Sequence, residues 1–158
     1  MKNFSGSYKA ISLWQPWASL VAMGLKKYET RSWSTNYRGR LVICSAQRNY
    51  PEQAQAYSKI FHKHQVLFSN TDNWFEWDEL PRGYAVAIAN LTDCIKMTDE
   101  FIGQQSQLEI DCGEWSAGRF AWKLEQIGKI ILPIKITGKQ GLFKLDIDLA
   151  LDDLEEVA

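Results

Sequence analysis

Short strand-like segments outnumber helix-like ones along this chain, and that imbalance constrains its fold more than any other sequence feature. Stretches rich in β-branched and aromatic residues occur at residues 8–13, 41–46, 84–97, 118–130, 132–136 and 142–145. Apolar residues at helical spacing occur at residues 16–24 and 51–65, and the acidic segment 146–156 is a third helical candidate. About six strands interrupted by two or three helices predict an α+β fold, built on a compact and mostly antiparallel β-barrel.

Length and composition predict one domain. The 158 residues match the usual size of a domain, and a hydrophobic fraction of 46% is enough to build a core. We therefore expect a single domain over residues 1–158, with residues 146–158 as an acidic C-terminal tail. No apolar run approaches the length of a membrane span, and the first ten residues lack the apolar stretch of a secretory signal. The sequence thus predicts a cytoplasmic protein without a membrane segment.

The cysteines and histidines form no ligand pattern. Cys44, Cys94 and Cys112 are odd in number and widely spaced, which favours neither a disulfide framework nor a zinc site. His62 and His64 lie two positions apart in a predicted helix, so they are expected to face different directions in solvent. We expect no metal and no cofactor.

The net charge of −1 conceals an uneven distribution. Residues 146–158 hold six acidic residues and no Lys or Arg, so the rest of the chain holds 18 basic and 13 acidic residues. Residues 1–50 hold eight basic residues and one acid, Glu29. Basic charge gathered in one region favours a pocket for one or a few nucleotides over a long polynucleotide footprint. The tail is expected to be a solvated face, or to fold back onto the basic region in place of an anionic ligand.

The segment from Gly24 to Arg31 is the most informative one. Gly24 is a natural C-terminal cap for the helix over residues 16–24, and Lys26 follows it at a corner. Residues 26–33 alternate like a strand, which places Lys27, Glu29, Arg31 and Trp33 on one side. The cations of this segment suit anionic or carbonyl oxygens, and the carboxylate suits exocyclic amines or hydroxyls. A salt-bridged surface strand would explain the same spacing.

Further residues are candidates for contact with a ligand. Trp14 and Trp33 flank the charged segment and can stack bases, although large aromatics also build cores, which is the expectation for Trp17. Polar candidates at strand ends and turns are Gln15, Ser45 and Arg119. A glycine directly before Arg119 would allow close approach of a ligand, or simply form a bulge.

The segment SLWQPWASLVAMGLKKYETRSW resembles the signature of the ASCH domain (activating-signal-cointegrator homology) of the PUA-like superfamily. Its G-x-K-x-x-E-x-R motif matches Gly24, Lys26, Glu29 and Arg31. The segments YRGRLVICSA, GYAVAIANLTDC, GRFAWKLEQI and ITGKQGLF follow in the expected order, so the resemblance spans roughly residues 8–145. It implies a PUA-type β-barrel, a cleft between the barrel and the helix before the motif, and RNA or a modified nucleotide as ligand.

The resemblance leaves two classes of function open. In a binding module, Lys26 and Arg31 contact anionic or carbonyl groups, Glu29 orients Arg31 or reads a base edge, and Trp14 forms part of the cleft wall. Alternatively, some small relatives hydrolyse N4-acetylcytidine with the motif lysine, a threonine and a helix glutamate. Lys26 matches that lysine, whereas Glu29 stands at the threonine position and the glutamate has no match. A metal-independent amidohydrolase or ribonuclease would then use Lys26 and Glu29.

A third hypothesis makes the chain a protein-interaction adaptor. Aromatic residues gather in the polar loop over residues 70–83, where Trp74, Phe75 and Trp77 would form the contact surface. A protein partner is therefore left open beside RNA or a small nucleotide or nucleoside. The chain itself is expected to be a monomer.

Overall fold

One seven-stranded sheet runs through the computed structural model of the chain, which describes residues 5–68 and 76–158. The strands are β1 (Gly6–Leu13), β2 (Tyr28–Arg31), β3 (Gly39–Ser45), β4 (Tyr84–Lys96), β5 (Phe120–Lys135), β6 (Phe143–Ile147) and β7 (Leu154–Glu156). Their order is β2-β5-β4-β3-β1-β6, with β7 paired to β5. Every pair is antiparallel except β1 with β3. The predicted α+β, PUA-like, mostly antiparallel barrel is confirmed, with one strand more than expected.

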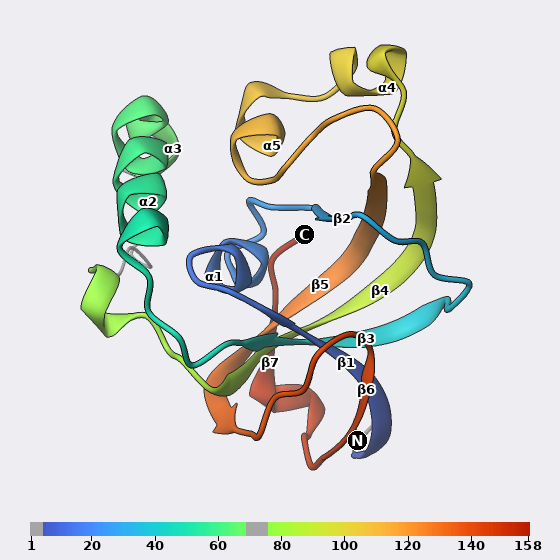
Figure 1. Ribbon diagram of the computed structural model, residues 1–158. Coiled ribbons are helices and arrows are strands. Elements are labelled where there is room, and N and C mark those ends of the chain that lie inside the picture. The colour runs from blue at the N-terminus through green and yellow to red at the C-terminus, as the bar shows by residue number, and fades with distance from the viewer. Residues whose placement is uncertain (1–4, 69–75) are drawn as a thin grey trace.

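Five short helices accompany the sheet. They are α1 (Trp17–Ala22), α2 (Pro51–Lys63), α3 (Gln65–Phe68), α4 (Asp99–Gly103) and α5 (Gln107–Asp111), with 3-10 turns at Trp77–Glu79 and Leu151–Asp153. Figure 1 shows α1 inside the curve of the sheet, α2 and α3 to one side, and α4 and α5 beyond β2. Within residues 5–68 and 76–158, no helix is both long and apolar enough to cross a membrane.

Helix α1 connects the barrel to the other helices. Its small residues Ala18 and Ala22 pack into the main core cluster with sheet residues such as Trp122. Leu20, on another face, packs in a second cluster with Ile60 of α2 and with Cys112, which directly follows α5. A six-residue helix has little stability of its own, so these two sets of contacts hold it. The position of α1 therefore fixes where α2 and α5 stand relative to the sheet.

Helices α4 and α5 were not predicted from the sequence. Each has only five residues, which is too short for a periodic apolar pattern. Both begin with a side-chain cap: Thr98 Oγ1 accepts from the N–H of Phe101, and Ser106 Oγ accepts from the N–H of Glu109. The sequence Ser-x-x-Glu at residues 106–109 is the signal that could have revealed α5. The two strands predicted over 118–130 and 132–136 form the single strand β5.

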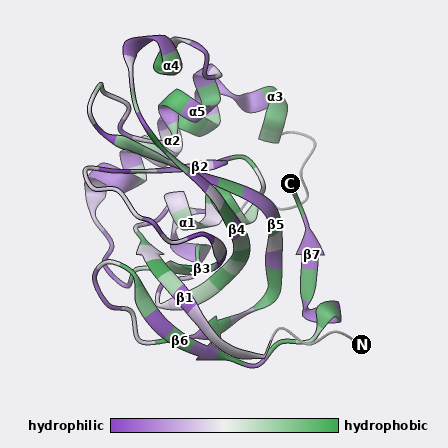
Figure 2. Cartoon of the chain, turned by 90° about the vertical axis from the view of Figure 1, so that its right-hand side faces the viewer, coloured by the Kyte–Doolittle hydropathy of each residue, from purple (hydrophilic) through white to green (hydrophobic). Residues whose placement is uncertain are grey.

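The expectation of an acidic helix over residues 146–156 is wrong. Ile147 and Leu149 are buried with exposed Asp148 between them, which is the alternation of an extended chain. Further on, β7 pairs with residues 128–130 of β5 (Figure 2). All six acidic side chains of the tail are exposed, as expected of a solvated face. Val157 packs against the main core cluster.

Gly24 combines a left-handed backbone with a close approach. Its φ is +76°, and a Cβ at this position would lie 2.5 Å from the carbonyl oxygen of Val157. We expect Gly24→Ala to lower the free energy of unfolding by about 2–4 kcal/mol, because backbone strain and overcrowding act together. Gly141→Ala is the matched control, with a φ of +67° and nothing within 4 Å, and it should show the strain alone. The free energy of unfolding is measured by urea denaturation. An equal decrease in the two variants would contradict the proposed contact with Val157.

Candidate ligand-binding cleft

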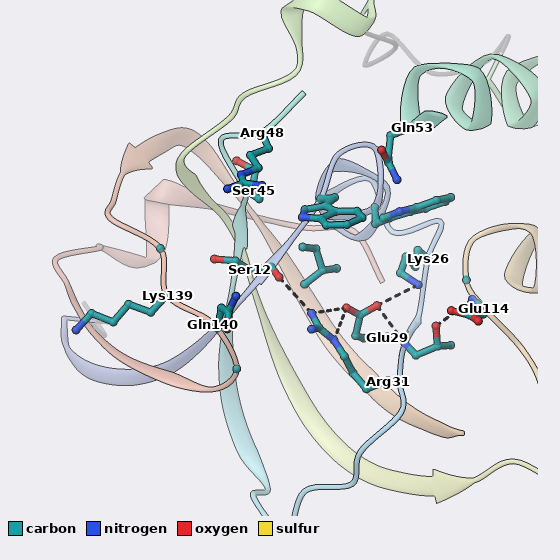
Figure 3. Close-up of a pocket in the computed structure, with 18 of the residues that line it drawn as sticks. Ser12, Lys26, Glu29, Arg31, Ser45, Arg48, Gln53, Glu114, Lys139 and Gln140 are labelled. Atoms are coloured by element: carbon teal, nitrogen blue, oxygen red, sulfur yellow. Dashed lines mark hydrogen bonds and ion pairs between the residues drawn. The ribbon is translucent and has the colours of Figure 1, made fainter. Parts of the chain in front are cut away.

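A cavity of 1090 Å³ opens where β1 and β2 end near α1 (Figure 3). Five segments that are distant in sequence line it: residues 12–14, 29–33, 45–48, 112–114 and 137–141. Lys26, Gln53 of α2, Gly83 and Arg119 also line it. The resemblance predicted a cleft between the barrel and the helix before the motif, and Trp17 of α1 contributes to the lining.

Glu29 lies at the centre of the buried charges. The residue is 7% exposed and pairs across the sheet with Trp122, which is fully buried. Its Oε1 accepts from the N–H of Thr30 at 3.0 Å and lies 3.6 Å from Lys26 Nζ. Its Oε2 lies 3.1 Å from Arg31 Nε and 2.9 Å from Arg31 Nη2. Both carboxylate oxygens are thus occupied, as burial of a charge requires.

Lys26 is buried and is held by two hydrogen bonds and one ion pair. The residue is 1% exposed, and Nζ donates to the carbonyl oxygens of Tyr28 and Cys112, each at 2.6 Å. Glu29 Oε1, 3.6 Å from Nζ, adds an ion pair to these two hydrogen bonds. The turn after Gly24 fixes the backbone that carries this side chain, because the N–H groups of Leu25 and Lys26 both donate to the carbonyl oxygen of Leu20. Strand alternation had placed Lys27 beside Glu29, but β2 begins only at Tyr28, and Lys27 is exposed.

Arg31 bridges two strands that do not pair in the sheet. Its Nη2 donates to the carbonyl oxygen of Ser12 on β1 at 3.1 Å while the same guanidinium holds Glu29 on β2. The Arg31 side chain is 24% exposed, and the residue lines the cavity. Among the described residues, its Nη1 has no hydrogen-bond partner. Arg31 therefore combines a fixed position with N–H donors still available.

Glu109 of α5 supports β2 from outside the cavity, a role that no sequence pattern predicted. The residue is 6% exposed; its Oε1 accepts from the N–H of Lys27 at 2.9 Å and its Oε2 from the N–H of Tyr28 at 3.3 Å. Burial raises the pKa of this carboxyl above its ordinary 4.5, although the charge of Lys26 and the two N–H donors act in the opposite direction. Glu109 thus anchors the start of β2 to the α4–α5 segment.

Aromatic side chains form the mouth of the cavity. Trp14 is 48% exposed, and its ring lies 5.0 Å from that of Tyr50. The Tyr50 hydroxyl accepts from Arg48 Nη1 at 2.8 Å, which holds this exposed guanidinium beside the rings. Trp33 is 37% exposed and stands edge-on to Trp122, with the ring centroids 4.8 Å apart. The mouth therefore presents two accessible indole surfaces and a cation.

The remaining predicted contact residues divide into two groups. Ser45 and Arg119 line the cavity, although Ser45 Oγ also exchanges hydrogen bonds with the backbone of Tyr84. Gln15 does not lie among the lining residues. Its side chain is buried and holds the start of α1, with Nε2 donating to Ser19 Oγ and to the carbonyl of Pro81, each at 2.7 Å.

Sequence reasoning missed several lining residues, namely Ser12, Arg48, Gln53, Glu114, Lys139 and Gln140. Ser12, Lys139 and Gln140 lie in segments that carry the family resemblance, but no local pattern marks any of the six as a ligand contact, because they come together only through folding. The expectation for His64 also needs correction, since its Nε2 lies 2.8 Å from Asp111 Oδ2 rather than in solvent. Among residues 5–68 and 76–158, no group of three or more His, Cys, Asp or Glu side chains could hold a metal ion.

Trp77, proposed as part of an adaptor surface, is half-buried and engaged within the fold. Its Nε1 donates to Asn49 Oδ1 at 3.0 Å, and the Arg82 guanidinium lies 4.5 Å from its ring centroid. Trp74 and Phe75 lie outside the described residues.

Comparison with known proteins identifies the family of this chain. The ASCH domain model matches residues 11–136, which is well over half of the sequence, and the chain therefore belongs to the ASCH domain family. It is 28% identical over 150 residues to activating signal cointegrator 1 of Mus musculus, and 28% identical over 149 residues to the Homo sapiens protein of the same name. Each alignment covers 92% of this chain but only 23% of the relative, so the chain spans about a quarter of the length of these proteins.

The position of Lys26 predicts a role in stability. Lys26→Ala removes the donor from two buried carbonyls and one partner from a buried carboxylate. We expect a loss of about 3 kcal/mol in the free energy of unfolding. Lys27→Ala, at the exposed neighbour, should change it by less than about 0.5 kcal/mol. The measurement is urea denaturation of both variants, and an unchanged midpoint for Lys26→Ala would contradict the buried network.

Glu109 predicts a pH dependence of stability. Because its pKa is raised in the folded state, the carboxyl keeps its proton to higher pH when folded than when unfolded. The favourable contribution of the Glu109 carboxyl to the free energy of unfolding is complete below pH 4.5 and is lost as the pH rises through the raised pKa. Glu109→Gln removes this titration, so the variant should gain stability relative to wild type as the pH increases. A difference in the free energy of unfolding that does not change with pH would contradict this prediction.

Proposed function

We propose that this cleft binds RNA or a single nucleotide, as an ASCH domain that recognises its ligand with fixed cations and accessible indoles. The observation that carries the proposal is the geometry of Arg31. This residue lines the cavity and is anchored by Glu29 and Ser12, while its Nη1 has no hydrogen-bond partner among the described residues. A guanidinium suits phosphate and carbonyl oxygens because its N–H donors lie in one plane. The family is generally one of RNA-binding domains, which also supports the proposal.

Each charged residue has a distinct part in this proposal. Arg31 contacts the ligand, because it lines the cavity and is partly exposed. Glu29 orients Arg31 rather than reading a base edge, because both of its oxygens are already occupied. Lys26 holds the Glu29 carboxylate in place and contributes its positive charge at the cavity wall. Such a prepositioned charge lowers the ordering cost of binding.

The mouth of the cleft suits the rest of a nucleotide. Trp14 offers an exposed ring on which a base can stack, and stacking of this kind tolerates every base. Arg48, held next to it through Tyr50, is placed to neutralise a phosphate. A base and its phosphate belong to the same nucleotide, and the Trp14 ring and the Arg48 guanidinium both adjoin Tyr50.

The hydrolase alternative has less support. A catalytic lysine needs a lone pair or a proton that it can exchange with substrate. The Lys26 ammonium instead donates to Tyr28 and Cys112 and lies beside Glu29, so catalysis would require the loss of buried hydrogen bonds. The adaptor alternative would require the release of Trp77 from Asn49 and Arg82. Binding needs no such change.

The test measures binding of a fluorescent single-stranded RNA and of nucleoside monophosphates to variants of the mouth. Trp14→Ala and Arg48→Ala should each weaken binding by roughly 5- to 100-fold, from the usual value of a stacked base or a charge-assisted hydrogen bond. Both side chains are exposed, so the fold should persist.

Arg38→Ala is the matched control. Arg38 is an exposed arginine paired with Asp93, outside the cavity lining. Its loss should leave affinity almost unchanged. If Arg38→Ala and Arg48→Ala weaken binding equally, the attraction is a general effect of charge and the proposed site is wrong.

A further inference from the structure

Two buried polar atoms at the cavity lack partners. Among the described residues, four buried side-chain N or O atoms make no hydrogen bond, and two of these, Ser12 Oγ and Gln53 Oε1, belong to residues that line the cavity. Buried polar atoms in folded proteins almost always have a partner, because an unpaired one forfeits its hydration. Two such atoms at the same cavity indicate groups whose partners a ligand supplies.

Gln53 is the more informative of the two. It lies in the first turn of α2, and Figure 3 shows its side chain projecting from that helix toward the cavity. Its Oε1 is buried without a partner, whereas its Nε2 is not one of the four unpaired atoms of the described residues. A hydroxyl such as Ser12 Oγ can donate or accept, whereas a carbonyl oxygen can only accept. Gln53 therefore calls for a ligand with an N–H or O–H donor at that position.

Nucleobases differ in whether they carry a hydrogen-bond donor or an acceptor at their exocyclic position. Adenine and cytosine carry an exocyclic amine, where hypoxanthine and uracil carry a carbonyl oxygen. An amine facing Gln53 Oε1 completes a hydrogen bond. A carbonyl oxygen there meets an acceptor unless the amide turns to offer Nε2, and the observed orientation favours the amine. Stacking on Trp14 and phosphate contact at Arg48 treat both kinds of base alike. Discrimination between amine-bearing and carbonyl-bearing bases thus depends on the side-chain amide of Gln53.

We propose that Gln53 makes the cleft selective for bases that carry an exocyclic amine, with Gln53 Oε1 accepting a hydrogen bond from that amine. The inference rests on the proposed function, because it assigns specificity to the same nucleotide site. It adds a specificity-determining residue on α2, outside the Gly24–Arg31 motif. The motif and the mouth supply affinity, and Gln53 supplies the choice of base.

The experiment compares two pairs of nucleoside monophosphates by titration calorimetry: AMP with IMP, and CMP with UMP. Each pair shares ribose and phosphate and exchanges an amine for a carbonyl. Wild type should prefer AMP and CMP by roughly 2- to 10-fold, the value of one hydrogen bond. Gln53→Leu should abolish this preference, whereas Gln53→Glu, which keeps the acceptor, should retain it.

Gln55→Leu is the matched control, since Gln55 is exposed on the same helix and lies outside the cavity lining. It should leave the preference at the wild-type value, and unfolding midpoints check that all variants fold. Equal binding of both members of each pair by wild type would overturn the inference and leave the proposed function standing. So would a preference that survives in Gln53→Leu.

The 2′-deoxy monophosphates provide a further arm, because a ribose hydroxyl could also donate to Gln53. If wild type loses affinity for deoxynucleotides and Gln53→Leu removes that loss instead of the base preference, Gln53 reads the ribose and the inference is wrong. Absence of binding by every monophosphate and by RNA would overturn the proposed function, and this inference with it.

Discussion

The buried Glu29 carboxylate is the constraint on which the cleft depends. A charge removed from water must be paired, and Glu29 is paired from both sides by Lys26 and Arg31. Each cation also reaches a distant part of the chain. Lys26 donates to the carbonyl of Cys112 after α5, and Arg31 donates to the carbonyl of Ser12 on β1. One carboxylate thereby joins β2 to the helical segment and to the far side of the barrel.

The backbone at the end of α1 places Lys26 where it can join this network. The helix ends at Ala22, and the left-handed turn at Gly24 brings Lys26 back beneath Leu20. Only glycine fits there, because the carbonyl of Val157 lies against the position of a Cβ. The last residues of the acidic tail thus take part in shaping the site, although their charges face solvent. A motif that reads as a local pattern depends on residues more than a hundred positions away.

The cleft combines a rigid floor with a more exposed mouth. Charges at the floor are already hydrogen-bonded, so they need no rearrangement when a ligand arrives. At the mouth, Trp14, Trp33 and Arg48 retain accessible surface that a ligand can cover. Gln53 stands on a separate helix, so the element that would choose the base is independent of the elements that hold the charges. Affinity and selectivity can then vary separately on one fold.

The sequence by itself determined the α+β class, most of the strands, the helix before Gly24 and the Gly24–Arg31 motif with its pairing of Glu29 and Arg31. These follow from local rules: alternation in strands, spacing in helices and the freedom of glycine. Only the tertiary structure decided that Lys26 rather than Lys27 joins Glu29, that Glu109 supports β2, and that Arg48 and Gln53 reach the cavity. Lys26 meets Cys112 across 86 positions and Lys27 meets Glu109 across 82. Contacts at such separations leave no periodic signal in one sequence, because packing against the whole sheet and not the neighbouring residues sets them.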